Sequence, residues 1–322
     1  MAYIRTILGD IDARQLGVTN CHDHLIRTGG MEINHGGEDM RLPSVDKAIE
    51  EAGYFMKAGG NSIIEMNPIG LGRDIRKLLE VNRRLPGLNL VVTTGFHAGE
   101  FYDNAVHWVN LYTVEQIAEL LVQEIEEGID IYDYMGPIVE RSSAKAGCIK
   151  IGTGYGTVTP FEKKFISAAA LAQRATGVAI NTHTQQGTMA VEQAQMLIGL
   201  GVPPEKIAIG HVQRNPDPWY HKKIASLGVT LMYDGGYRVK YWPDSDRVML
   251  IRTLVEAGYQ HQVVLGEDAG KKSYQKAYGG GVGIDYDQAV FMPRLRDEGF
   301  AESVIDDIYC GNPARLFAIE KV

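Results

Sequence analysis

Eight short apolar runs recur along the chain, and glycine, proline or charged residues bound each of them. They cover residues 17–24, 61–66, 88–95, 146–152, 177–183, 206–211, 228–234 and 262–268. Short and nearly continuous apolar runs are typical of strands that are buried on both faces. The pattern therefore predicts eight buried strands distributed over the whole chain.

Amphipathic helical patterns fill most of the intervals between these runs. Residues 44–58 place apolar side chains on one face, and a pair of glycines ends the pattern. Thr113 begins another helical pattern, with Gln116 at the position that completes a capping box. Thr159 is followed by proline and, two residues later, by glutamate, which together favour a helix start. We therefore expect a helix after most of the predicted strands.

Strand and helix patterns that alternate eight times predict a (β/α)8 TIM barrel, which is an α/β fold with a closed parallel sheet. An open doubly wound sheet is the competing architecture, but it rarely needs eight such units. In addition, no GxGxxG sequence follows the first run. The length of 322 residues suits one barrel, and no low-complexity linker interrupts the series. We expect a single domain over residues 1–322.

Composition narrows the choice of partners and setting. The net charge of −8 disfavours a nucleic-acid partner, which usually requires a basic face. The N-terminus has no apolar signal core, and no apolar stretch approaches the length of a membrane span, so no membrane partner is expected. The three cysteines are far apart and form no CxxC spacing. A reducing, cytoplasmic location fits these features best.

Histidines and an aspartate recur where the predicted strands end. His22 and His24 end the first strand and, being two residues apart, face the same side, which at a barrel mouth is the interior. His183 and His211 end two later strands, and Asp268 ends the eighth, which lies beside the first in a closed barrel. A lone histidine such as His183 or His211 is more often a satisfied interior residue than a ligand. Their recurrence on separate strands favours a site for zinc or a similar divalent ion.

Lys150 lies in the middle of the apolar run AGCIKIGT. A buried, unpaired ammonium is costly, so this lysine must lose its charge, find an anion or be chemically changed. Three interpretations compete: a Schiff base with a carbonyl substrate, a salt bridge, or a carbamate formed with carbon dioxide that could bridge two metal ions. The histidines and aspartate at the other strand ends favour the carbamate.

In these residues the sequence resembles the phosphotriesterase family of the amidohydrolase superfamily, and the resemblance spans nearly the whole chain. The family's HxH pair, carbamylated lysine, two single histidines and aspartate are matched by His22, His24, Lys150, His183, His211 and Asp268. The segment NPIGLGRD (67–74) looks like the family's turn after the second strand. The segment GNPARLF (311–317) looks like its C-terminal helix signature.

The resemblance implies two divalent ions held by these side chains. One ion would take His22, His24 and Asp268, and the other would take the two single histidines. Carbamylated Lys150 and a hydroxide would bridge both ions. Zinc is the first choice of metal, with manganese or cobalt as the alternatives. Asp268 would also be the catalytic residue that accepts the proton of the hydroxide and passes it to the leaving alkoxide.

Cations and tyrosines cluster after the last two predicted strands, in the segments YRVKYW and KKSYQKAY. In an acidic protein this clustering favours a pocket for an anionic group such as phosphate, although an ordinary solvated loop is the alternative. The candidate substrate-binding residues are Arg238, Lys240, Lys272 and Tyr274. A further candidate is His97, which lies where many lactonases of the family have a tyrosine near the metals.

The segment SYQKAYGGG also resembles the branch of the family that hydrolyses phosphorylated sugar lactones. We therefore expect a binuclear metal-dependent lactonase that opens a phosphorylated furanose lactone, a small anionic molecule. The alternatives are a phosphotriesterase or carboxylesterase acting on a neutral ester, a Schiff-base aldolase that uses Lys150, and a metal-bearing protein without turnover. The sequence does not determine the oligomeric state. A homodimer is one option, because barrels of the family that the sequence resembles often form dimers.

Overall fold

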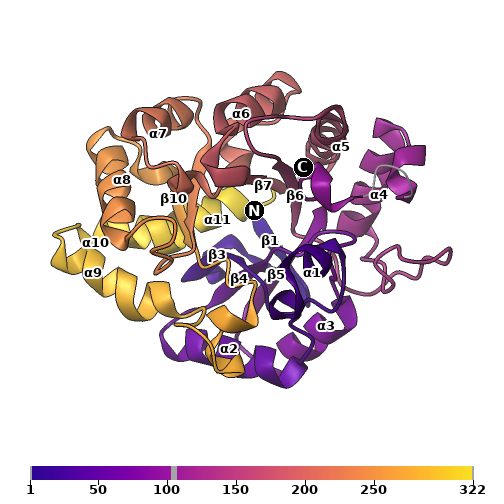
Figure 1. Ribbon diagram of the computed structural model, residues 1–322, viewed down its shortest axis with the longest axis horizontal. Helices are drawn as coiled ribbons and strands as arrows, with labels where there is room; N and C mark the ends of the chain where they lie inside the picture. Colours follow the sequence, from indigo (N-terminus) through magenta and orange to yellow (C-terminus); the bar gives the residue numbers. More distant parts are fainter. Residues whose placement is uncertain (1, 103–106, 321–322) are drawn as a thin grey trace.

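The centre of the molecule is a barrel of eight parallel strands, as seen in the computed structural model, which describes residues 2–102 and 107–320 (Figure 1). The strands follow the chain order: β3 (Thr19–Asp23), β4 (Ser62–Glu65), β5 (Asn89–Gly95), β6 (Cys148–Thr153), β7 (Ala179–Thr184), β8 (Ile207–Gly210), β9 (Thr230–Asp234) and β10 (Val263–Gly266). The barrel closes after β10, where the backbone N–H groups of Glu267 and Asp268 donate to the carbonyl oxygen of His22 at 3.1 and 2.8 Å. The predicted TIM barrel is confirmed.

Helices surround the strands (Figure 1). The α-helices are α1 (Met31–Gly36), α2 (Val45–Lys57), α3 (Ile75–Arg84), α4 (Val114–Glu126), α5 (Pro160–Thr176), α6 (Ala190–Gly199), α7 (Pro218–Ala225), α8 (Asp244–Glu256), α9 (Met292–Asp297), α10 (Glu302–Asp306) and α11 (Asn312–Phe317). The capping boxes predicted at Thr113 and Thr159 start α4 and α5. Within the described ranges, no helix combines the length and the apolar character needed to cross a bilayer.

An antiparallel hairpin precedes the barrel, formed by β1 (Tyr3–Thr6) and β2 (Gly9–Asp12). The apolar pattern does not predict it, because the second strand, GDID, is largely polar and exposed. Ile4 of the hairpin packs with Leu16 and with Leu316 and Phe317 of α11 inside one apolar cluster. These side chains close the barrel at the end where its strands begin, so the opposite end is left for a site.

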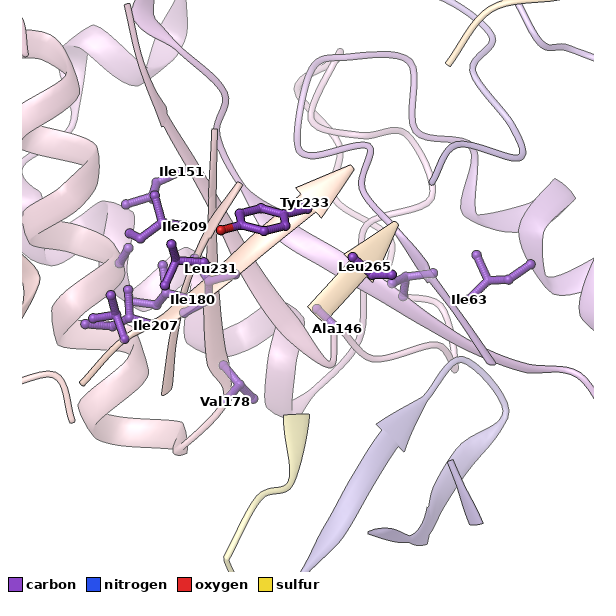
Figure 2. Close-up of a cluster of buried hydrophobic side chains, with 14 of the residues drawn as sticks. Ile63, Ala146, Ile151, Val178, Ile180, Ile207, Ile209, Leu231, Tyr233 and Leu265 are labelled. Carbon is purple, nitrogen blue, oxygen red and sulfur yellow. The ribbon is translucent and has the colours of Figure 1, made fainter. Parts of the chain in front are cut away.

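Alternate residues of each strand face the two sides of the barrel wall. One apolar residue from each strand lies in the interior cluster: Cys21, Ile64, Val91, Cys148, Ala179, Ala208, Met232 and Val264. Residues between them pack outward against the helices, as Figure 2 shows for Ile180, Ile207 and Leu231. Because the strand period is two, Lys150 shares the inward side of Cys148. The alternation thus determines which polar side chains reach the barrel mouth.

Four of the predicted strands, those at 17–24, 61–66, 206–211 and 262–268, end one or two residues earlier than expected. β8 stops at Gly210 and β10 at Gly266, so His211 and Asp268 lie beyond the strands rather than within them. Both residues have left-handed backbones, with φ of 63° and 48°, and this conformation cannot continue a strand. Non-glycine residues held in this region are strained and cluster at functional sites. In both cases the side chain reaches the barrel mouth.

A buried arginine anchors the NPIGLGRD turn after β4. The guanidinium of Arg73 lies 2.7 Å from Glu124 of α4 and 2.9 Å from Asp133, and its side chain is 1% exposed. It also donates to the carbonyl oxygen of Thr93 at 3.0 Å. Asp133 in turn accepts a hydrogen bond from the backbone N–H of Gly70 at 2.9 Å. This network joins the turn to the loop that follows α4.

We expect Arg73→Met to lower the free energy of unfolding by about 3–5 kcal/mol, because it leaves two buried carboxylates without their cation. Urea unfolding followed by circular dichroism measures the change. Arg84→Met is the matched control, since Arg84 pairs with Asp46 and Glu80 at the surface and should cost less than about 1 kcal/mol. Equal losses for the two variants would contradict the anchoring role.

Candidate metal centre

The residues predicted to bind metal line one cavity at the mouth of the barrel, where the strands end. All six do so: His22, His24, Lys150, His183, His211 and Asp268. The cavity has a volume of about 180 Å³. The side chains come from β3, β6 and β7 and from the residues that follow β3, β8 and β10. The structure therefore brings together residues that are spread over most of the sequence.

Distances within the cluster suit shared cations. The Nε2 atoms of His22 and His24 lie 3.7 and 3.3 Å from Oδ1 of Asp268. These three residues present their donor atoms within 4.8 Å of one another, which is close enough to hold one ion. The ring of His211 lies 5.0 Å from that of His22 and 4.5 Å from that of His183, measured between centroids.

In His24 and His183, a neighbouring side chain holds one nitrogen of the imidazole and leaves the other available. Nδ1 of His24 lies 2.9 Å from Oδ1 of Asn67, so Nε2 is left for the cavity. In His183 the arrangement is reversed: Nε2 lies 2.8 Å from Oε1 of Gln185, and the buried Nδ1 has no hydrogen-bond partner. Such bonds to the outer nitrogen fix the ring orientation of metal-binding histidines.

Asp234, at the end of β9, orients two further histidines and is absent from the predicted set. Its Oδ1 lies 2.6 Å from Nδ1 of His211, and its Oδ2 lies 3.3 Å from Nδ1 of His22. Although burial opposes ionisation, both histidines hold the pKa of Asp234 well below its usual range. Because it contacts the Nδ1 atoms, we assign it to orientation rather than ligation. Its position at the end of the apolar run VTLMYD is the signal that could have found it.

Lys150 is buried without a partner. Its side chain is 1% exposed, and Nζ makes no hydrogen bond with any described residue. Burial lowers the pKa of Lys150 to about 8, while Asp268 and Asp234 oppose that shift. A neutral amine can react with carbon dioxide, whereas a salt bridge would require a paired carboxylate. The orphaned amine therefore fits the carbamate better than the salt bridge.

The donor set as a whole fits divalent ions. Burial lowers the pKa of His24 to about 3 and that of His211 to about 4. At neutral pH both rings are therefore neutral, which is the form that binds metals. Imidazole nitrogens, one carboxylate and an unpaired amine on the interior of one barrel mouth are suited to two ions that share ligands.

Four of the predicted substrate residues line the same cavity, namely Arg238, Lys240, Tyr274 and His97. Lys272 does not: its ammonium lies 3.9 Å from the exposed carboxylate of Glu38, and the adjacent Lys271 lines the cavity instead. Lys272 begins a 3₁₀ turn whose next residue, Ser273, donates backbone and hydroxyl hydrogen bonds to Asp39 at 2.9 and 2.6 Å, and this holds Lys272 beside Glu38. Sequence position alone does not show which of two adjacent lysines a loop turns inward.

His97 offers a hydrogen-bond donor to the cavity. Its Nδ1 accepts a hydrogen bond from the backbone N–H of Ala98 at 2.7 Å, so the neutral ring carries its proton on Nε2. Burial keeps the pKa of His97 well below its usual value. Its ring centroid lies 4.3 Å from that of His183.

Two arginines contact the second carboxylate oxygen of Asp268, the one that does not face the histidines. The guanidinium groups of Arg214 and Arg238 lie 2.9 and 3.0 Å from Oδ2. Burial opposes ionisation of Asp268, but His24 and Arg238 hold its pKa well below the usual range. Arg214 was not predicted, because it lies three residues beyond a strand-end histidine in a polar loop.

A barrel mouth that gathers neutral histidines, an ionised aspartate and an unpaired lysine around a cavity is built for hydrolysis by metal-activated water. The fold and the site thus define the class of metal-dependent hydrolases.

Comparisons with known proteins identify the family within this class. The sequence profile of the phosphotriesterase family matches residues 2–317. The phospho-furanose lactonase of Mycoplasmopsis synoviae (strain 53) is 43% identical over 99% of this chain and 92% of its own length. An amidohydrolase from Mycoplasma synoviae superposes with a TM-score of 0.96 at 43% identity, covering 99% of this chain and 93% of its own. A lactonase from Listeria monocytogenes has a TM-score of 0.91 at 32% identity, covering 99% and 100%. The chain belongs to the phosphotriesterase family.

Proposed function

We propose that this protein is a lactonase that hydrolyses the ester bond of a phosphorylated furanose lactone. The family membership and the relatives named as lactonases support the reaction. The observation that carries the choice of substrate is a cationic wall on one side of the cavity, formed by Arg214, Arg238, Lys240 and Lys271. In a chain with a net charge of −8, this local excess of cations favours an anionic ligand.

Two lysines of this wall lie around one tyrosine ring, which supports a subsite for phosphate. The ammonium groups of Lys240 and Lys271 lie 5.4 and 5.8 Å from the ring centroid of Tyr274, and Lys240 also donates to the Tyr274 hydroxyl at 2.7 Å. The two arginines are already engaged with Asp268. The proposed phosphate subsite is therefore Lys240, Lys271 and the Tyr274 hydroxyl, with Lys271 in place of the predicted Lys272.

The metal ions would occupy the cluster described above. His22, His24 and Asp268 would hold one ion, and the two single histidines would hold the other, with carbamylated Lys150 shared between them. Carbamate formation joins Nζ to the carbon of carbon dioxide and releases one proton. Two bound divalent ions, with zinc as the first choice, would supply an acidified water and a Lewis acid for the lactone carbonyl.

In the proposed reaction, Asp268 transfers the proton and His97 donates a hydrogen bond. Oδ1 of Asp268 is the carboxylate oxygen nearest the two histidines of the HxH pair, and it is ionised, so it can accept the proton lost by the attacking water. The same group then passes that proton to the alkoxide released when the lactone C–O bond breaks. The Nε2–H of His97 can donate a hydrogen bond to a lactone oxygen and hold the ring in place.

Hydrolysis rates with and without phosphate test the substrate. We expect kcat/KM for a pentono-1,4-lactone 5-phosphate to exceed that for the unphosphorylated lactone by about 100-fold or more, because charge-assisted hydrogen bonds are strong. Lys240→Ala and Lys271→Ala should each lower kcat/KM for the phosphorylated substrate by about 10- to 100-fold, mainly through KM. Neither variant should slow the unphosphorylated lactone.

Lys272→Ala carries the same change of charge one position further on. It should have little effect, since its ammonium pairs with an exposed carboxylate outside the cavity. Equal rates on the two lactones in the wild-type protein would exclude the phosphate subsite. A clear preference for a neutral phosphotriester or carboxylic ester would instead support the alternative hydrolase function.

A further inference from the structure

A second carboxylate faces the cavity and has no part in the proposed metal centre. Among the described residues that line the cavity, the carboxylates are Asp268 and Glu32. Glu32 lies in α1, the short helix that follows β3, and its side chain is 12% exposed. The neighbouring residues Met31 and Ile33 line a separate apolar cavity, so the polar side chain of this helix turns towards the site.

A buried arginine fixes the position of Glu32. Nη2 of Arg27 lies 2.9 Å from Oε2 of Glu32, while its Nη1 donates to the carbonyl oxygen of Gly270 at 3.0 Å. Its Nε donates to Oδ1 of Asn67 at 3.0 Å, the same oxygen that lies 2.9 Å from Nδ1 of His24. Arg27 itself is 1% exposed. Glu32 is therefore attached to the same rigid framework as a proposed metal ligand.

Glu32 presents an acceptor where most other polar groups are donors. Oε2 forms an ion pair with Nη2 of Arg27, but neither Oε2 nor Oε1 accepts a hydrogen bond from the described residues. Apart from the proposed metal ligands, the other polar groups that line the cavity are guanidinium, ammonium and phenol groups and the imidazole of His97. Both oxygens of Asp268 are engaged, one by histidines and the other by arginines. A ligand hydroxyl that enters the cavity needs an acceptor for its hydrogen, and Glu32 offers one.

We propose that Glu32 accepts a hydrogen bond from a ring hydroxyl of the lactone and thereby selects polyhydroxylated lactones over deoxy lactones. This inference rests on the proposed lactonase function and adds a specificity residue to it. A site built to bond a substrate hydroxyl discriminates strongly against an analogue without it, because the buried polar group is then left unpaired. The phosphate and the hydroxyl would thus be recognised by opposite charges within one cavity.

The test compares a pentono-1,4-lactone 5-phosphate with its 2-deoxy and 3-deoxy analogues. In the wild-type protein we expect kcat/KM for one analogue to be about 10- to 100-fold lower than for the parent, as one hydrogen bond to a charged acceptor predicts. In Glu32→Ala the parent should fall to the level of that analogue, and the analogue itself should change little. Glu32→Gln keeps an acceptor oxygen and should retain part of the discrimination.

Glu38→Gln is the matched control, since it removes a negative charge six residues further along the same segment, from a side chain that is 70% exposed. It should leave the discrimination unchanged. Metal content, measured on every variant, shows whether the framework around His24 is intact. If Glu32→Ala slows the parent and both analogues equally, Glu32 is only a structural partner of Arg27 and the inference is overturned. If the wild-type protein hydrolyses no phosphorylated lactone at all, the proposed function fails as well, which is a different result from turnover without discrimination.

Discussion

Replacing Lys150 with methionine should abolish hydrolysis and reduce the amount of bound metal. Methionine has a similar length and apolar character, so the substitution fits the buried strand position. It removes the amine that would carry the carbamate shared by the two ions. We expect kcat to fall about a thousandfold or more, since loss of the metal ions removes several kcal/mol of transition-state stabilisation. Elemental analysis of the purified protein and steady-state kinetics measure the two effects.

Removal and re-addition of metal distinguish the metal hydrolase from an aldolase. A chelator should inactivate the wild-type protein, and added zinc, manganese or cobalt should restore it. Lys163→Met, which removes an exposed lysine from α5, serves as the control and should keep both metal and activity. Chelator-resistant activity, together with covalent trapping of a carbonyl substrate on Lys150 by borohydride, would favour the Schiff-base alternative.

Asp268→Asn should lower kcat by about 10²- to 10⁴-fold, the range typical of a lost general acid–base group. The amide keeps the size of the side chain but cannot accept a proton from the attacking water. Kinetics are measured with metal in excess, so that weaker binding does not limit the rate. Unchanged turnover at full metal occupancy would remove Asp268 from the path of the proton.

Asp234→Asn provides the comparison, because both carboxylates contact histidines of the cluster. Asp234 contacts only the outer nitrogens of its two histidines, so its loss should weaken metal affinity by about 10- to 100-fold. Excess metal should therefore restore most of the activity of Asp234→Asn but little of that of Asp268→Asn. Equal recovery of the two variants would contradict the separate roles assigned here.

The barrel was predictable because its strands are buried on both faces and therefore read as apolar runs. The interior positions of the site followed from the same pattern, since Lys150 shares the inward face of Cys148 through the period of two. The antiparallel hairpin at the N-terminus was not predictable in this way, because its second strand is polar. Local periodicity thus identifies elements that are buried, and it fails for those that are exposed.

The loop residues of the site could not be predicted, because tertiary contacts determine which loop side chains enter the cavity. Lys271 and Lys272 are identical in type and adjacent in sequence, but the hydrogen bonds of Ser273 to Asp39 hold Lys272 beside Glu38, while Lys271 lines the cavity. Glu32 gives no signal in the sequence, because its direction is set by contacts of Arg27 with Asn67 and Gly270. Long-range contacts of this kind are not encoded in the residues that flank a loop.

The closing contact of the barrel also governs when the enzyme becomes competent during its synthesis. The backbone N–H of Ala269 donates to Oδ1 of Asp23 at 3.0 Å across a sequence separation of 246 residues. The HxH histidines therefore emerge from the ribosome long before the carboxylate of Asp268, with which they would hold one ion. A nascent chain that lacks its last strand has an open wall and an incomplete set of ligands. Because Asp268 follows that strand, the proposed catalytic site is complete only after the final strand docks.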